Sequence, residues 1–123
     1  YEGKQNSEYF PLIIPIIEKL DSWILLSAKI NSLGRTESIV ENSMHIDLMN
    51  KSYLNTNPFK TAIFYLNNNN GYTKFETGEK VTSEKNKLIV FDGNKRHTGT
   101  SNSCEAKRRV ILNINYIPLV WSA

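Results

Sequence analysis

The chain of 123 residues has room for one hydrophobic core, so we expect a single domain over residues 1–123. Its 40% hydrophobic and 11% aromatic residues exclude a disordered chain, and no apolar run reaches the roughly 18 residues of a membrane span, so no membrane partner is expected. The formal charge of +3 includes one dense basic cluster, residues 107–109, without interleaved aromatic residues, so a nucleic-acid partner is not expected either.

The first predicted element is a short helix. Residues 1–9 are polar, carry no signal-peptide pattern and are expected to be frayed, and an opening on Tyr1 rather than Met is expected of a fragment of a longer chain. From Pro11 to Asp21 apolar side chains recur at i, i+3, i+4 and i+7, which predicts one helix ending near Ser22.

Short β-prone segments separated by turn residues make up the rest of the chain. The predicted strands are Trp23–Leu33, Ser43–Met49, Phe59–Asn67, Tyr72–Phe75, Glu79–Ser83, Lys87–Phe91 and Val110–Ile117. The run Asn67–Gly71 is a predicted turn, because Asn and Gly both tolerate positive φ. Many short strands at this spacing predict a mostly β fold, an antiparallel sandwich or barrel.

The segment around His45 carries the first candidate metal ligands. Side chains alternate across a strand, so His45 and Asp47 are predicted to share one face while Met44 and Ile46 share the other. An imidazole and a carboxylate on one face suit two neighbouring ligands of one metal. His-x-Asp is also common by chance, and the alternative is a polar strand edge that faces solvent.

The second histidine, His97, follows the predicted turn at 92–94. Together with His45 and Asp47 it would place two histidines and one carboxylate on one side of a metal and leave positions open, the usual provision for ferrous iron that binds a cosubstrate and O₂. Zinc is the alternative metal, although it more often takes a closed shell. The alternative for His97 is a solvated loop residue.

The last predicted strand presents a mostly polar face, formed by Arg109, Ile111, Asn113 and Asn115. Such a face inside a small barrel indicates a pocket, and the guanidinium of Arg109 would clamp a carboxylate there through two parallel hydrogen bonds. Arg108 competes for this role, although its phase puts it on the apolar face. The alternative is an edge strand with its polar face in water.

A further donor is predicted in the strand Phe59–Asn67. Tyr65 shares a face with Ile63 and Thr61, and its hydroxyl would reach into the barrel as a hydrogen-bond donor. The alternative is a core tyrosine whose hydroxyl is already hydrogen-bonded.

Taken in order, these pieces resemble the 2-oxoglutarate- and Fe(II)-dependent dioxygenases, most closely their prolyl-4-hydroxylase-like branch. The resemblance spans roughly residues 25–117 and rests on His45-Ile46-Asp47, Tyr65-Leu66-Asn67, the Gly-rich turn Gly71–Phe75, His97 and Arg109-Val110-Ile111. Two departures concern the turn, where the usual Gly-Gly-Glu-Thr appears as Asn70-Gly71-Tyr72-Thr73, and the helical support, which is short.

The resemblance implies a double-stranded β-helix (jelly-roll) barrel with the short N-terminal helix packed on its outside. It implies that Fe(II) is held by His45, Asp47 and His97. It also implies that Arg109 pairs with the far carboxylate of 2-oxoglutarate, helped by the hydroxyl of Tyr65, with Asn113 near the same cosubstrate.

The implied reaction is hydroxylation by O₂ with oxidative decarboxylation of 2-oxoglutarate to succinate and CO₂. The substrate would be a small molecule or a peptidyl group, and a prolyl or other amino-acyl residue is the nearest family analogue. The single cysteine, Cys104, excludes an intrachain disulfide and favours a reducing, cytoplasmic location.

Two other functions stay open on the sequence. One is a cupin-like metal enzyme with the same barrel that does not use 2-oxoglutarate. The other is a non-enzymatic binding module whose basic residues 107–109 meet an acidic partner. The identity of the substrate and the oligomeric state are left open by the sequence.

Overall fold

The computed structural model describes residues 1–48 and 58–119. Its helical elements are a 3₁₀ turn, η1 (Phe10–Ile13), and one α-helical turn, α1 (Ile14–Ile17). Its strands are β1 (Ser22–Gly34), β2 (Lys60–Tyr65), β3 (Tyr72–Phe75), β4 (Lys80–Thr82), β5 (Leu88–Asp92), β6 (His97–Gly99) and β7 (Arg108–Pro118). No helix in the described ranges is long and apolar enough to cross a membrane.

The N-terminal helix is present but shorter than predicted, because two prolines interrupt it. Pro11 is the second residue of the 3₁₀ turn and Pro15 the second residue of the α-helical turn, each near an N-terminus where a missing N–H does no harm. The α-helical turn ends at Ile17 rather than near Ser22. Ahead of it, the backbone of Tyr1 exchanges two hydrogen bonds with that of Ala28, 2.7 and 2.9 Å long.

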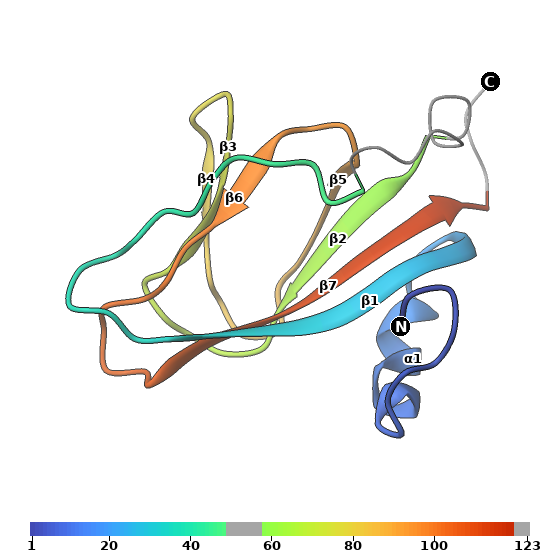
Figure 1. The fold of residues 1–123 in the computed structure, drawn as a ribbon, viewed down its shortest axis with the longest axis horizontal. Helices are drawn as coiled ribbons and strands as arrows, with labels where there is room; N and C mark the ends of the chain where they lie inside the picture. The colour runs from blue at the N-terminus through green and yellow to red at the C-terminus, as the bar shows by residue number, and fades with distance from the viewer. Residues whose placement is uncertain (49–57, 120–123) are drawn as a thin grey trace.

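The strands form two antiparallel sheets, one of order β1-β7-β2-β5 and one of order β4-β3-β6. In Figure 1 the long strands β1, β7 and β2 form one wall, β3, β4 and β6 lie across from it, and α1 lies on the outside of the first wall. The fold is therefore mostly β, a double-stranded β-helix barrel with a short helix on its outside, and the predicted fold class is confirmed.

The two central strands of the four-stranded sheet, β2 and β7, are buried on both faces, and alternation along β7 assigns each side chain to one of them. Its outer face packs against the helical turns through the core residues Leu20, Ala28, Ala62, Leu112, Ile114 and Tyr116. Its inner face carries a smaller apolar cluster of Ile63, Tyr65 and Ile111. Buried polar residues share this inner face, namely Thr61, Arg109, Asn113 and Asn115. The interior of the barrel is therefore partly polar.

The strand predicted at Ser43–Met49 is wrong for the residues that the structure describes, and Met49 lies outside them. Residues 35–48 cross between the sheets, with isolated backbone bridges at Glu41–Thr100 and His45–His97. The alternation of polar and apolar residues here is accompanied by no continuous ladder. The short strand β6 was not predicted, since three residues carry too little pattern.

Candidate metal centre

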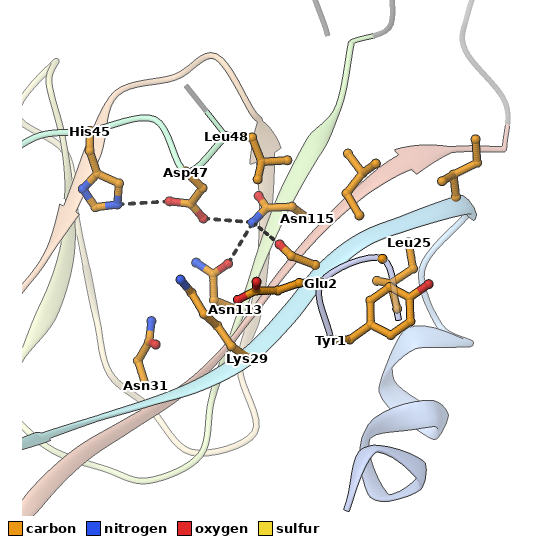
Figure 2. Close-up of a pocket in the computed structure, with 14 residues that line it drawn as sticks. Tyr1, Glu2, Leu25, Lys29, Asn31, His45, Asp47, Leu48, Asn113 and Asn115 are labelled. Atoms are coloured by element: carbon orange, nitrogen blue, oxygen red, sulfur yellow. Dashed lines mark hydrogen bonds and ion pairs between the residues drawn. The ribbon is translucent and has the colours of Figure 1, made fainter. Parts of the chain in front are cut away.

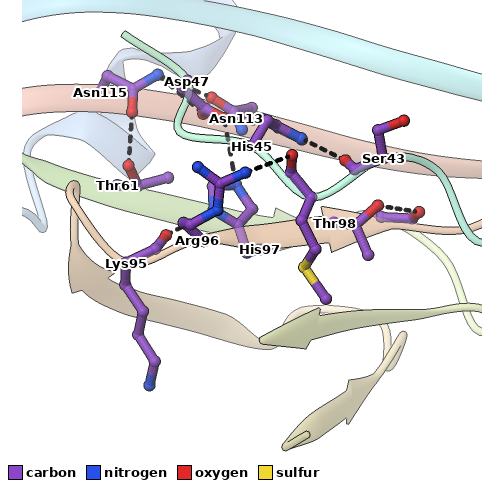
Figure 3. A network of polar contacts seen from close by, with 12 residues as sticks. Ser43, His45, Asp47, Thr61, Lys95, Arg96, His97, Thr98, Asn113 and Asn115 are labelled. Atoms are coloured by element: carbon purple, nitrogen blue, oxygen red, sulfur yellow. Dashed lines mark hydrogen bonds and ion pairs between the residues drawn. The ribbon is translucent and has the colours of Figure 1, made fainter. Parts of the chain in front are cut away.

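Two backbone hydrogen bonds place the two histidines side by side. The N–H of His45 donates to the carbonyl oxygen of His97 at 2.8 Å, and the N–H of His97 donates to that of His45 at 3.0 Å. Their ring centroids are 4.7 Å apart. Asp47 Oδ1 lies 3.0 Å from His45 Nε2 and 3.2 Å from His97 Nε2, as Figure 3 shows. One candidate ligand atom from each of the three residues therefore lies within 4.8 Å of the others.

Both imidazoles are oriented by a backbone carbonyl two residues earlier in the chain. His45 Nδ1 lies 3.0 Å from the carbonyl oxygen of Ser43, and His97 Nδ1 lies 3.0 Å from that of Lys95. A carbonyl oxygen only accepts, so each Nδ1 carries the hydrogen and a neutral ring has its lone pair on Nε2. The Nε2 lone pairs of the two rings face Oδ1 of Asp47, and a cation placed among these three atoms would stabilise the arrangement. The donor set therefore fits a metal ion.

Asp47 is ionised by the groups around it. Burial by itself raises the pKa of this carboxyl, but the polar contacts with His45, His97 and Asn113 outweigh burial and hold the pKa well below its usual range. The hydrogen bond to Asp47 in turn raises the pKa of His45 above its ordinary value. The carboxylate is thus available as a ligand at neutral pH.

A buried amide holds the other oxygen of this carboxylate. Asn115 Nδ2 donates to Asp47 Oδ2 at 3.2 Å, and Thr61 Oγ1 donates to Asn115 Oδ1 at 2.7 Å. Asn115 lies directly opposite Thr61 on one side and Ser27 on the other in the sheet register, so these contacts follow from strand pairing. Figure 3 shows this chain of contacts ending at the two histidines. Sequence reasoning placed Asn115 on the polar face but gave it no role.

The three candidate ligands differ in exposure. His97 is 2% exposed, and its ring packs edge-on against Phe91, with ring centroids 4.9 Å apart. The side chain of His45 is 48% exposed and that of Asp47 10%. The centre is therefore buried on the β6 side and open on the side of residues 35–48.

Arg109 lies inside the barrel, close to this cluster, and is 3% exposed. Its Nε donates to Ser83 Oγ at 2.9 Å, its Nη1 to the Thr100 carbonyl at 3.3 Å and its Nη2 to Thr73 Oγ1 at 3.5 Å. Burial lowers the pKa of the guanidinium. No carboxylate of the described residues pairs with it, and the undescribed ranges 49–57 and 120–123 contain neither Asp nor Glu. Arg109 is therefore a buried cation without a counter-charge among the described residues.

Arg108, the competing candidate, faces away from the interior. It is exposed, and its Nε donates to Ser32 Oγ at 2.6 Å. Lys107 is exposed as well, but Arg109 is buried, so the three basic residues do not form one surface patch. Strand phase decides between the two arginines because β7 is regular through this point.

Two cavities adjoin the histidines. A smaller one, of about 120 Å³, is lined by Arg109 and Thr73 together with His45 and His97. A larger one, of about 700 Å³, is lined by His45, Asp47, Asn115 and the inner face of β1, and Figure 2 shows it. The two cavities share His45, Asn31 and Asn113. The candidate metal centre therefore lies where they meet.

The two remaining predicted residues lie close to these cavities in different ways. Asn113 lines both of them. Tyr65 is fully buried, which raises its pKa, and its hydroxyl donates to Thr73 Oγ1 at 2.7 Å. Its ring lies 5.9 Å from the Arg109 guanidinium. The structure therefore places Tyr65 behind Thr73 and Arg109, outside the lining of the smaller cavity.

No family model matches the sequence. No curated protein matches it either. Among solved structures the chain is similar to a cupin protein from Bacteroides fragilis, with 11% sequence identity and a TM-score of 0.48, over 78% of this chain and 69% of that one. A likeness at this level carries no argument about function, and the fold described above rests on the sheet topology of the chain itself.

Proposed function

We propose that this chain is a non-haem Fe(II)- and 2-oxoglutarate-dependent dioxygenase. It would hydroxylate a C–H bond of its substrate, placing one oxygen atom of O₂ in the new hydroxyl and the other in succinate as 2-oxoglutarate loses CO₂. One observation carries the proposal. The smaller cavity has Arg109, a buried cation without a counter-charge in the part of the chain that the structure describes, and two candidate metal ligands in the same wall. A dicarboxylate that reaches a metal with one end supplies the missing counter-charge with the other.

The metal part of the proposal rests on the donor set. Two imidazoles and one carboxylate that leave positions open are typical of ferrous oxygenases, and His45, Asp47 and His97 provide them. When bound, the iron would supply the activation of O₂. The chain's own residues orient the ligands, through the carbonyls beside each Nδ1 and the amide of Asn115 on Asp47.

The cosubstrate part rests on Arg109. Its guanidinium is held in place by Ser83, Thr100 and Thr73, so little side-chain freedom is lost when a carboxylate binds. An ion pair out of water is stronger than one at the surface, and the desolvation cost of the arginine is already met in the folded chain. The site is therefore preorganised for one carboxylate.

The experiment is an anaerobic titration in two steps, Fe(II) first and then 2-oxoglutarate, followed by the visible absorption band of the iron–2-oxoglutarate complex. With O₂ admitted, succinate release is measured. We expect the band and the succinate in the wild-type chain and in Arg108→Ala, which alters the neighbouring exposed arginine. In Arg109→Ala we expect iron to bind and the band to require at least about tenfold more 2-oxoglutarate, given the loss of a charge-assisted bidentate contact. A wild-type chain that binds iron and shows no band contradicts the proposal.

A cupin-like metal enzyme of the same barrel is the second candidate, because the metal cluster does not depend on Arg109. It predicts iron binding that needs His45, Asp47 and His97, no band with 2-oxoglutarate, and no effect of Arg109→Ala. The binding-module alternative would rest on Lys107 and Arg108, which are exposed, because Arg109 is buried.

A further inference from the structure

The larger cavity offers a second place for a ligand beside the metal centre. Its volume of about 700 Å³ is within the range of small-molecule sites, roughly 300–1,000 Å³. Arg109 is absent from its lining, whereas His45 and Asp47 belong to it. A molecule in this cavity therefore reaches the metal centre without occupying the space at Arg109. If the proposed function holds, the larger cavity is where the substrate binds.

The cavity contains a cation, Lys29, that has no acidic partner among the described residues. Lys29 is exposed to solvent, lies on the inner face of β1 opposite Asn113 in the sheet register, and lines the mouth of the cavity. No carboxylate oxygen of the described residues lies within ion-pair distance of its ammonium group, and the undescribed ranges contain no Asp or Glu. In Figure 2 the side chain of Lys29 extends from β1 toward His45. Its charge is therefore directed into the cavity.

Asn31 provides a neutral hydrogen-bond donor beside Lys29. Asn31 follows Lys29 by two residues on the same face of β1 and lines both cavities. Its side-chain amide makes no hydrogen bond with the described residues, whereas Asn115 and Asn113 are engaged with each other and with Asp47. An ammonium and a free amide from one strand face suit the two oxygens of one carboxylate.

The remaining charges of the cavity decide how much negative charge a ligand can carry. Asp47 is committed to the histidines and Asn115, and Glu2, which is exposed, also lines the cavity. A second negative charge on the ligand would be repelled by these carboxylates. Four apolar residues also line the cavity and suit a hydrocarbon portion, namely Ile24, Leu25, Leu26 and Leu48. In Figure 2 Leu48 lies beside Asp47, whereas Leu25 lies beside Tyr1, away from His45.

We propose that the larger cavity binds a small-molecule substrate with one free carboxylate, which Lys29 and Asn31 hold while its apolar portion lies beside the metal centre. That the ligand is a substrate rests on the proposed function, whereas its binding rests on the cavity alone. It assigns two separate carboxylate sites to the chain, one at Arg109 for the cosubstrate and one at Lys29 for the substrate.

The test uses hexanoate and hexanamide, two probes of closely similar shape that differ in charge. Each probe is titrated into the isotope-labelled full chain. The titration is done first with the chain free of ligands and then with the chain loaded with Zn(II) and 2-oxoglutarate, and NMR follows the backbone amide shifts. We expect hexanoate to shift the amides of Lys29 and Asn31 in a saturable way, and hexanamide to bind at least about tenfold more weakly. Equal binding of the two probes, or no binding of hexanoate, overturns the inference.

Variants separate the two carboxylate sites. Lys29→Gln is expected to remove the preference for hexanoate and Lys29→Arg to retain it, while Lys107→Gln, an exposed lysine outside both cavities, serves as the matched control. Arg109→Ala is expected to leave the preference intact. Hexanoate shifts that disappear in Arg109→Ala and persist in Lys29→Gln overturn the inference.

The same samples distinguish failure of the inference from failure of the proposed function. Lys29→Gln should form the iron–2-oxoglutarate band at the same cosubstrate concentration as the wild-type chain. If the band forms and hexanoate does not bind at Lys29, the substrate inference is wrong and the proposed function stands. If hexanoate binds at Lys29 and the band is absent, the carboxylate site stands without the oxygenase.

Discussion

Asn115 donates to the one oxygen of Asp47 that the histidines leave free. Its Nδ2 lies 3.2 Å from Asp47 Oδ2, while His45 and His97 both approach Oδ1. Both Asn115 and its own partner, Thr61, are buried on the inner face of the sheet. The carboxylate is therefore oriented by the four-stranded sheet, although Asp47 itself lies on a segment outside any strand.

The first prediction concerns this contact. Asn115→Leu keeps the size of the side chain and removes the donor to Asp47, so metal affinity should fall by about 10- to 100-fold, the usual effect of losing a group that orients a ligand. The Thr61 hydroxyl loses its acceptor as well, which should cost about 1–3 kcal/mol in the free energy of unfolding. Competition with a chelator measures the first effect and urea unfolding the second.

Thr61→Val is the control for this prediction. It removes the hydroxyl and leaves Asn115 and its donation to Asp47 in place, so its effect on metal affinity should be smaller than that of Asn115→Leu. Unchanged metal affinity in a folded Asn115→Leu chain would show that Asp47 needs no support from β7.

The second prediction concerns the stability of the chain without ligands. Arg109→Met removes a buried cation that has no counter-charge within the described ranges and keeps most of its volume, so the free energy of unfolding should stay the same or rise by a few kcal/mol, about 1–4. The same variant should lose 2-oxoglutarate binding. Arg108→Met, on the exposed face, should change neither property by much. Destabilisation of Arg109→Met by several kcal/mol would mean that the hydrogen bonds to Ser83, Thr100 and Thr73 outweigh the desolvation cost.

The third prediction uses the close approach of Gly71 to Arg109. A Cβ on Gly71 would lie 2.5 Å from Arg109 Cδ and 2.8 Å from the backbone oxygen of Ser101, whereas a Cβ on Gly34 would meet Arg108 Nη1 at an ordinary 3.7 Å. Gly71→Ala should therefore displace the Arg109 side chain and raise the KM for 2-oxoglutarate while metal affinity is retained. Gly34→Ala is the matched control and should behave like the wild-type chain. An unchanged KM in Gly71→Ala would show that Arg109 does not bind the cosubstrate.

The fourth prediction concerns pH. The pKa of His45 is raised in the folded chain by its hydrogen bond to Asp47, so the stability that this contact contributes is fully present below the unfolded pKa of about 6.5. It should be lost as the pH rises from about 6.5 through the raised folded value. The metal competes with the same proton, so metal affinity should rise over this window.

Urea unfolding of the metal-free chain from about pH 5 to about pH 9 measures this dependence, with His45→Gln as the comparison. The variant should show a flatter profile over the upper part of the range. Asp47 affects stability at low pH. Its pKa is lowered in the folded chain, so the stability from its ionised carboxylate is present above about pH 3.9 and is lost as the pH falls through the folded value. Parallel profiles of the two chains above about pH 6.5 would contradict the assignment to His45.

Local pattern was enough for several features of the site. The phase of β7 separated Arg109 from Arg108, since a regular strand alternates without exception over these residues. The same alternation placed Asn113 on the inner face. By contrast, the sequence grouped His45 and Asp47 by predicting a strand there, and the described residues form none. The backbone bridge between His45 and His97 brings these side chains together instead.

The sequence by itself determined the fold class, the polar inner face of β7 and the residue types that a metal and a carboxylate require, because strand periodicity and side-chain chemistry are local properties. Only the tertiary structure decided that Asn115 contacts Asp47 and that Tyr65 lies behind Thr73. It also decided that Arg109 and Lys29 have no acidic partner in the part of the chain that the structure describes. Whether a charge is compensated depends on every segment packed around it, and strands distant in sequence supply those neighbours.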